Sequence, residues 1–390
     1  MLNFNFYNPT QIVFGQGQLS QLDSLVPKNA KVLITYGGGS VVRNGVLAQV
    51  KAELAKSPRS VSEFGGIESN PKFATAMQAV ERVRAEQIDF LLAVGGGSVM
   101  DATKFIALAA ANADYQGQEE QLLIHGFNPV PVNNAIALGT VATLPATGSE
   151  MNCFAVISRG EDKLPVYSPL TFPRFSILDP ELTYTLPAIQ VANGVVDAFV
   201  HVVEQYLTYP VDARFQDRTA EGILQTLLEI GKTTVDEPTN YAVRANLVWS
   251  ATMALTGLIG SGVPHDWSVH MLGHELTALF GVDHAQSLAV VLPSMWRVRR
   301  EPKREKLLQY AERVWGIREG SDDARIDAAI ANTEAFFNSL GIATRLSAHG
   351  VDQQGIERVL QALEKHGMVA LSERGDVTLE VSRQVLELAL

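Results

Sequence analysis

The chain has 390 residues, a length typical of about two domains, and 46% of them are hydrophobic, which excludes disorder as its main state. It carries 31 Lys and Arg against 42 Asp and Glu, a formal net charge of −11, and this excess of acid disfavours a nucleic-acid partner. Its one cysteine, Cys153, excludes an intrachain disulfide and a thiolate metal cluster. Neither a run of ~18 apolar residues nor a secretory leader is found, so we expect a cytoplasmic enzyme without a membrane partner.

The first half of the chain alternates short apolar runs, typical of buried strands, with segments of helical periodicity. Glycine-rich turns separate them, and this repeated order of strand, loop and helix predicts a parallel sheet wrapped by helices. We expect strands at 31–36, 59–64, 88–94, 135–142 and 175–178, and helices at 41–56, 73–86 and from the second glycine cluster to about 111.

After Asp179 and Pro180 the strand-like runs stop and amphipathic helices continue to the end of the chain. We place the domain boundary at Leu186, because Pro187 suits the first turn of a helix. The expected helices span 187–208, 216–230, 241–259, 266–279, 305–315, 322–340, 355–366 and 378–388. The two halves have no flexible linker between them, so the cleft between them is the expected ligand site.

Two glycine clusters, 37–40 and 95–98, each follow a predicted strand and precede a predicted helix. This geometry presents backbone N–H groups and a positive helix end to an anion, and two such clusters at the ends of parallel strands indicate a dinucleotide. Neither is a G-x-G-x-x-G motif, because Val42 and Met100 occupy the sixth positions. A tight turn that needs positive φ is the alternative reading of each cluster.

The first cluster also bears on which dinucleotide binds. A site selective for NAD places a carboxylate where it accepts a hydrogen bond from the ribose 2′-OH. Here no Asp or Glu follows the strand until Glu53, whereas the loop amides, Ser40 and Arg43 suit a 2′-phosphate. The sequence therefore predicts NADP(H).

Five of the eight histidines lie between residues 201 and 284. Asp197 and His201 are four residues apart on one predicted helix, and His270 and His274 repeat this spacing on another, so each pair shares a helical face. His284 follows in an expected loop. Imidazole and carboxylate groups on otherwise apolar helices suit Zn²⁺ or Fe²⁺, whereas a structural ion pair with surface histidines is the alternative.

Together these motifs resemble the iron-containing (group III) alcohol dehydrogenases over the whole chain. Segment 95–104, with its Gly-Gly-Gly-Ser-x-x-Asp-x-x-Lys pattern, is similar to the family's pyrophosphate signature, and 143–150 is similar to the loop along the cofactor. The opening 6–17 resembles the family's N-terminal strand, and 260–264 with the histidines after it resembles its second metal segment. The loop 36–40 is similar to that of NADPH-dependent butanol dehydrogenases and broad-range aldehyde reductases.

The resemblance implies a fold and a set of site residues. The fold is an α/β dinucleotide-binding domain with a Rossmann-like parallel sheet at 1–186, followed by an all-α metal and substrate domain at 187–390. The implied metal ligands are Asp197, His201, His270 and His284. The implied catalytic residues are His274, which lines the substrate pocket, and Asp101. The implied cofactor contacts are Gly37, Gly38, Gly39, Ser40, Asn70, Gly95, Gly96, Gly97, Ser98, Asp101, Thr140, Thr143, Leu144, Thr147 and Lys163.

The activity implied by the resemblance is the reversible reduction of short and medium aldehydes by NADPH, with a divalent metal, Zn²⁺ or Fe²⁺, polarising the carbonyl oxygen. The family also implies a homodimer. Detoxification of aldehydes and fermentative alcohol formation are both compatible with this chemistry. A glycerol-dehydrogenase-like or dehydroquinate-synthase-like enzyme of the same superfamily is the alternative, and a nucleotide-binding protein without activity is another.

Overall fold

The computed structural model describes residues 1–390, and the chain forms two compact units. The sheet unit comprises Tyr7–Leu186 and Pro238–Val248. The helical unit comprises Met1–Phe6, Pro187–Glu237 and Trp249–Leu390. Because each unit is assembled from more than one stretch of chain, the domain limits predicted above, 1–186 and 187–390, stay a prediction.

The sheet unit is built on six parallel strands in the order β1-β8-β5-β4-β2-β3. All residues of β4 are buried, as expected of a parallel strand that is covered on both faces. The predicted parallel sheet is confirmed, with every expected strand present and shifted by at most two residues at either end. The strands are β1 (Gln11–Phe14), β2 (Lys31–Tyr36), β3 (Ser60–Phe64), β4 (Phe90–Gly95), β5 (Ala137–Ala142) and β8 (Phe175–Leu178).

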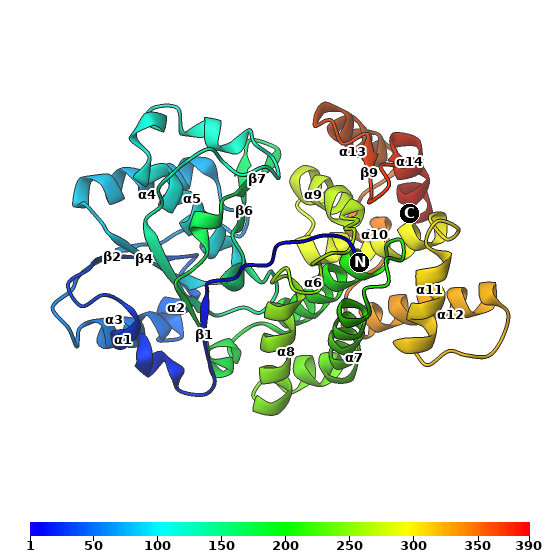
Figure 1. Cartoon of the computed structure of the whole chain (residues 1–390), viewed down its shortest axis with the longest axis horizontal. Coiled ribbons are helices and arrows are strands. Elements are labelled where there is room, and N and C mark those ends of the chain that lie inside the picture. Colours follow the sequence, from blue (N-terminus) through cyan, green and yellow to red (C-terminus); the bar gives the residue numbers. More distant parts are fainter. The chain divides into compact units, whose positions relative to one another are not determined.

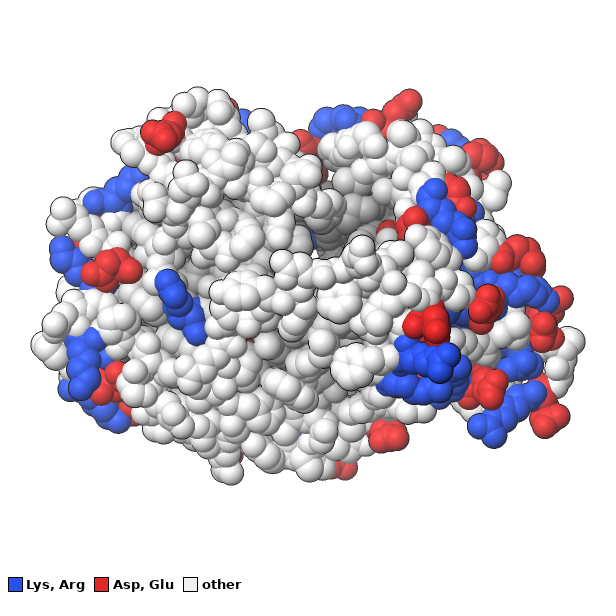
Figure 2. Space-filling model, viewed as in Figure 1, with Lys and Arg blue, Asp and Glu red and all other residues white.

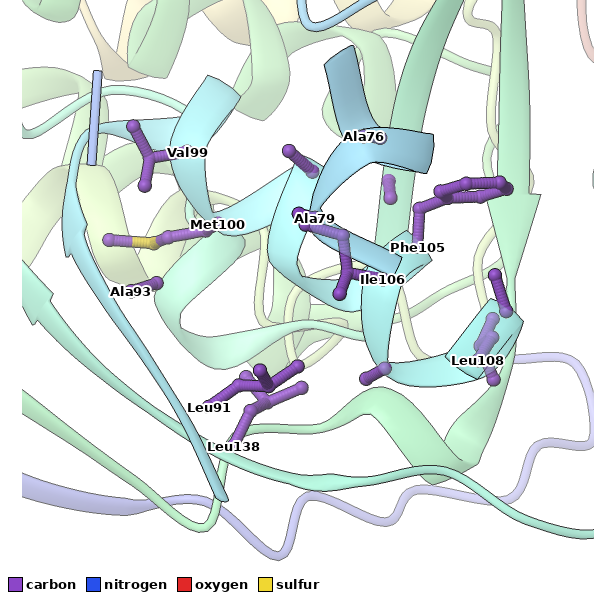
Figure 3. Close-up of a cluster of buried hydrophobic side chains, with 14 of the residues drawn as sticks. Ala76, Ala79, Leu91, Ala93, Val99, Met100, Phe105, Ile106, Leu108 and Leu138 are labelled. Atoms are coloured by element: carbon purple, nitrogen blue, oxygen red, sulfur yellow. The ribbon is translucent and has the colours of Figure 1, made fainter. Parts of the chain in front are cut away.

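Helices cover both faces of this sheet. Side chains of successive β4 residues point to opposite faces, so Leu91 joins one apolar cluster and Leu92 the other. Figure 3 shows the first cluster, in which Met100 lies beside Ala93 and Leu91 lies beside Leu138. The helices of this unit are α1 (Leu22–Leu25), α2 (Ser40–Arg43), α3 (Val46–Leu54), α4 (Phe73–Glu86) and α5 (Gly97–Ala111), and α4 lies next to α5 (Figure 1).

Three features of the sheet unit differ from the sequence prediction, one of which is the short helix α1, which was not expected. The helix expected at 41–56 is broken into α2 and α3, because Gly45 adopts φ 81° and the Asn44 side chain accepts the backbone N–H of Val46. An antiparallel hairpin of β6 (Phe154–Arg159) and β7 (Asp162–Tyr167) was not predicted, and it lies beside α5 (Figure 1).

The helical unit has the all-α character that was predicted, apart from a hairpin of two-residue strands, β9 (Ala370–Leu371) and β10 (Val377–Thr378). Its helices are α6 (Ala188–Tyr206), α7 (Arg214–Asp236), the end of α8 (Tyr241–Ala254, of which Tyr241–Val248 belongs to the sheet unit), α9 (Ser268–Phe280), α10 (His284–Val298), α11 (Arg304–Arg313), α12 (Asp322–Ser339), α13 (Gln353–Lys365) and α14 (Leu379–Leu388). None of the helices is both long and apolar enough to cross a bilayer.

One helix of the helical unit, α10, was missed by the sequence analysis. The expectation that His284 lies in a loop is wrong, because His284 is the first residue of α10. Pro293 lies inside this helix, where a proline usually indicates that a helix has ended. The preceding run 288–292 is mostly apolar, so the sequence shows no amphipathic periodicity there either.

Short 3₁₀ turns and surface charges complete the description. The turns occupy Gln18–Gln21, Ala113–Tyr115, Glu119–Leu123, Ser149–Met151, Pro169–Thr171, Pro180–Thr183 and Leu346–His349. Figure 2 shows acidic and basic side chains interspersed over α11 and α12, where Arg304 pairs with Asp323 at 2.8 Å. Exposed pairs of this kind are screened by solvent and contribute little to stability.

Candidate functional site

Two helices of the helical unit bring a carboxylate and two imidazoles together. Asp197 and His201 lie one turn apart on α6, and His270 lies in the first turn of α9. All three side chains are buried, and their ligand atoms lie within 4.8 Å of one another. The rings of His201 and His270 are stacked with centroids 4.7 Å apart, and Nε2 of His201 is 3.7 Å from Oδ1 of Asp197. The three groups therefore converge on one point.

Two further histidines of the predicted site, His274 and His284, lie next to this group. His284, at the start of α10, places Nε2 3.6 Å from Oδ1 of Asp197 and its ring centroid 5.3 Å from that of His270. It is not part of the set whose ligand atoms are all within 4.8 Å of one another. The ring of His274 lies 5.2 Å from that of His284 and 6.2 Å from that of His270. His274 is thus farther from the converging group than His284.

The chemistry of these donors fits a divalent metal ion. Burial lowers the pKa of His201 to about 4, with the nearby Asp197 opposing that shift, so the ring is neutral at physiological pH. Metal ligands must be deprotonated, and a neutral imidazole meets this condition. A carboxylate with imidazoles suits Zn²⁺ and Fe²⁺ equally well.

Glu204 is a site residue that the sequence analysis missed. It lies on α6, is buried, and its Oε1 accepts the backbone N–H of Val269 at 2.7 Å. Its Oε2 accepts the backbone N–H of His270 at 3.2 Å and also meets Nδ1 of the His270 ring. Burial raises the pKa of Glu204, and the two backbone N–H groups oppose that rise. The spacing of Asp197, His201 and Glu204 (i, i+4, i+7) places all three on one helical face, and this was the available signal.

In the sheet unit, the second glycine cluster joins β4 to α5. A Cβ added at Gly95 would lie 2.6 Å from Cγ2 of Val99, and one at Gly96 would lie 3.2 Å from Cβ of Leu144. A Cβ at Gly97 would lie 2.6 Å from Cγ2 of Thr147. These glycines are therefore required for close packing, and the loop 143–148 lies against the start of α5. The predicted contacts Thr143, Leu144 and Thr147 are brought to this turn, since Thr143 also donates its backbone N–H to the carbonyl of Gly95 at 3.0 Å.

Asp101 and Lys104, one turn apart on α5, form hydrogen bonds with segment 149–156, which continues this loop. Asp101 accepts hydrogen bonds from the Ser149 hydroxyl at 2.6 Å and from the backbone N–H of Val156 at 2.9 Å, one on each oxygen. The Lys104 ammonium donates to Ser149 at 2.7 Å and to Asn152 at 3.0 Å. Burial raises the pKa of Asp101 and lowers the pKa of Lys104 to about 8, and each opposes the shift of the other. The observed contacts of Asp101 are those of a residue that positions the loop, and its predicted catalytic role stays a prediction.

The first glycine cluster, Gly37–Ser40, joins β2 to α2. A Cβ at Gly37 would lie 3.2 Å from the carbonyl oxygen of Ile67, whereas a Cβ at Gly38 would have no atom within 4 Å. Gly39 adopts φ 91°, which favours glycine. The guanidinium of Arg43 donates to the carbonyl of Gly38 at 3.3 Å, so a positive charge lies at this loop.

The other predicted cofactor contacts lie on several elements of the sheet unit. The Ser98 hydroxyl donates to the carbonyl of Ser69, which brings the exposed neighbour Asn70 towards the start of α5. Thr140, on β5, donates its hydroxyl to Ser176 at 2.7 Å inside the sheet. Lys163 lies on β7, and its charge lowers the pKa of Asp101 against the larger effect of burial. The roles assigned to these residues stay predictions.

Two family models together match most of the chain. A model described as iron-containing alcohol dehydrogenase matches residues 9–180, and one described as Fe-containing alcohol dehydrogenase family, C-terminal, matches residues 191–373.

Individual proteins are similar over the full length. The NADPH-dependent aldehyde reductase YqhD of Escherichia coli (strain K12) is 58% identical over 391 residues, covering 100% of both chains. The probable NADH-dependent butanol dehydrogenase 1 of Bacillus subtilis (strain 168) is 37% identical over 372 residues, covering 94% of this chain and 95% of the relative. The crystal structure of Escherichia coli K-12 YqhD matches this fold with a TM-score of 0.97 at 56% identity, covering 100% of this chain and 99% of that chain.

Proposed function

The chain belongs to the iron-containing alcohol dehydrogenase family, and we propose that it is a metal-dependent aldehyde reductase that transfers hydride from NADPH to short and medium aldehydes. The convergence of Asp197, His201 and His270 carries this proposal, because a reductase of this kind needs a buried set of neutral imidazoles and a carboxylate. The 58% identity to an NADPH-dependent aldehyde reductase over the whole chain supports it.

In this proposal the ion would be held by the three residues of the converging group and by His284. A bound divalent ion supplies Lewis acidity to the carbonyl oxygen as negative charge develops there. The protein's part is to keep the imidazoles neutral by burial and to fix their direction. His284 lies 3.6 Å from Asp197, near enough to complete a set of four donors after a small side-chain movement.

The glycine clusters bind the dinucleotide in this proposal. Backbone N–H groups at Gly95–Ser98 face the pyrophosphate at the start of a 15-residue helix, where the helix dipole favours an anion. Gly37–Ser40 and Arg43 receive the 2′-phosphate, and the open space over Gly38 leaves room for it. Asp101 and Lys104 position the loop along the cofactor by the hydrogen bonds described above. Orientation of the nicotinamide towards the carbonyl carbon is worth several kcal/mol of the barrier.

The proton that completes the alcohol is assigned to His274. It lies one turn after His270 on α9, and its ring is 5.2 Å from that of His284. An imidazole at this position is suited to pass a proton at neutral pH, with a water molecule as the other carrier. We further propose a cytoplasmic homodimer that removes reactive aldehydes.

The experiment that tests the function combines metal analysis with turnover. Purified protein is assayed for zinc and iron, and NADPH oxidation is followed at 340 nm across a panel of aldehydes before and after chelation, and after return of each metal. We expect chelation to abolish turnover and one of the two metals to restore it. Full activity of metal-free protein would refute the mechanism, and oxidation of glycerol with NAD⁺ in place of aldehyde reduction would favour the glycerol-dehydrogenase-like alternative.

A further inference from the structure

The carboxylate of Glu204 joins α6 to the first turn of α9. Its two oxygens accept the backbone N–H groups of Val269 and His270, and Oε2 also meets Nδ1 of the His270 ring. The backbone carbonyl of Glu204 also accepts the N–H of Asp266 at 2.9 Å. Glu204 therefore joins α6 to the start of α9 by four contacts.

The start of α9 needs this partner. Trp267, at the N-cap position, is in the left-handed region with φ 61° and its side chain makes no capping hydrogen bond. The first N–H groups of a helix have no partner within the helix, and the helix dipole makes a negative charge favourable there. Glu204 supplies that charge from a different helix, and Asp266 accepts the N–H of Ser268 at 3.1 Å.

The same contact determines which ring nitrogen of His270 carries a proton. Oε2 of Glu204 accepts the backbone N–H of His270, so it presents a lone pair on that side. Because both oxygens of Glu204 already accept backbone N–H groups, we infer that Nδ1 of the ring is the donor in the third contact. A neutral ring with its proton on Nδ1 carries its lone pair on Nε2, which is the ring atom turned away from Glu204.

We propose that Glu204 is a positioning residue that holds His270 in the tautomer and orientation in which Nε2 binds the metal ion. This inference rests on the proposed function, because it takes His270 as a metal ligand. In other proteins a carboxylate behind a metal-binding histidine raises the basicity of the ligand, and its loss costs 10- to 100-fold in metal affinity or activity. Glu204 adds a second effect, since it orients the whole first turn of α9.

The test replaces Glu204 by glutamine, which keeps the size of the side chain but removes its charge and one acceptor. Glu221→Gln is the matched control, because Glu221 is a buried glutamate of the same unit that accepts the Tyr206 hydroxyl at 2.9 Å. The affinity for Zn²⁺ is measured by competition with a fluorescent zinc chelator, and the Tm of each metal-free protein is measured in parallel. We expect Glu204→Gln to lose about 10- to 100-fold in Zn²⁺ affinity, and Glu221→Gln to stay within threefold of wild type. We also expect Glu204→Asp, which keeps the charge, to fall in between.

A Zn²⁺ affinity of Glu204→Gln within threefold of wild type would overturn the proposal. Should that variant not fold, a crystal structure of wild-type protein loaded with Zn²⁺ decides the question, because coordination through Nδ1 of His270 would contradict the proposal and coordination through Nε2 would support it. Failure of the proposed function looks different, since wild-type protein would then bind no metal or reduce no aldehyde.

Discussion

Replacement of Gly97 by alanine tests the packing on which the proposed nucleotide site depends. Gly97 is the first residue of α5 and is buried under the loop 143–148. An added Cβ would lie 2.6 Å from Cγ2 of Thr147 and 3.0 Å from its Cβ, and closer still to Oγ1. Rotation of the Thr147 side chain does not relieve the contact with its Cβ. The loop must therefore retreat by a few tenths of an ångström in a region packed as densely as a crystal.

The structure sets the size of the effect. The loop continues into Ser149 and Asn152, both of which accept hydrogen bonds from the buried Lys104 ammonium, so it has little freedom to move. Overpacking at a site of this kind costs about 1–3 kcal/mol in the free energy of unfolding. A displacement of ~1 Å near reacting groups lowers kcat/KM by up to ~10²-fold, so a retreat of a few tenths of an ångström should lower it by less than that. We therefore expect both a loss of stability and weaker use of NADPH.

Urea unfolding and NADPH binding, followed by nucleotide fluorescence, provide the measurements. Gly222→Ala is the control, because Gly222 lies inside α7 with no atom within 4 Å of an added Cβ. Alanine is favoured over glycine in a helix, so this control should be more stable than wild type by about 0.5–1 kcal/mol.

A double-mutant cycle with Thr147→Ala isolates the part of the clash that Oγ1 and Cγ2 make, because alanine keeps the Cβ. That replacement removes Oγ1 and Cγ2, and alone it costs about 1 kcal/mol through the lost hydrogen bond from the backbone N–H of Ser149. With both replacements present, the effects should be non-additive by at least ~0.5 kcal/mol, the double mutant being more stable than the sum predicts. Strict additivity, or a Gly97→Ala protein as stable as wild type, would refute the reasoning.

Three further predictions concern cofactor choice, a buried ion pair and pH. Gly38→Asp places a carboxylate at the open position in the first glycine cluster, so the ratio of kcat/KM for NADPH to that for NADH should fall; an unchanged ratio would contradict the assignment of the 2′-phosphate site. Lys303→Met removes the buried partner of Asp266, 2.7 Å away, and should cost about 3–5 kcal/mol in urea unfolding. The exposed control Lys232→Met should cost less than ~1 kcal/mol, and equal effects would show that burial does not matter here. Burial lowers the pKa of Lys104 to about 8 from its ordinary value of 10.5. Between these two pH values the unfolded chain binds more protons than the folded protein does, so the free energy of unfolding increases as pH rises. Relative to Lys104→Met, wild type should gain about 3 kcal/mol over that range, and a stability difference that does not change with pH would argue against the lowered pKa.

Local patterns in the sequence were sufficient for most of the fold. The strands 31–36 and 175–178 were predicted with the observed ends, and α6 was predicted within two residues, because apolar runs and helical periodicity report on burial of near neighbours in the chain. The spacing of Asp197 and His201 placed both on one face of α6 for the same reason. The prediction failed where helix-breaking residues were misread. Gly45 interrupts the helix expected at 41–56, and Pro293 lies inside α10, which was not predicted.

Contacts between residues far apart in the chain were decided by the tertiary structure. Glu204 meets Val269 and His270 across about 65 positions of sequence, and no local pattern specifies which helix end a buried carboxylate will face. Burial of Lys104 beneath the loop 147–154 is of the same kind, since its three acceptors lie 45 to 50 residues away. Helical period and residue type are properties of a single segment, whereas the partner of a buried charge is selected by the packing of whole elements. This is why the shared helical face of Asp197 and His201 could be predicted from the sequence, whereas the contact of Glu204 with His270 could not.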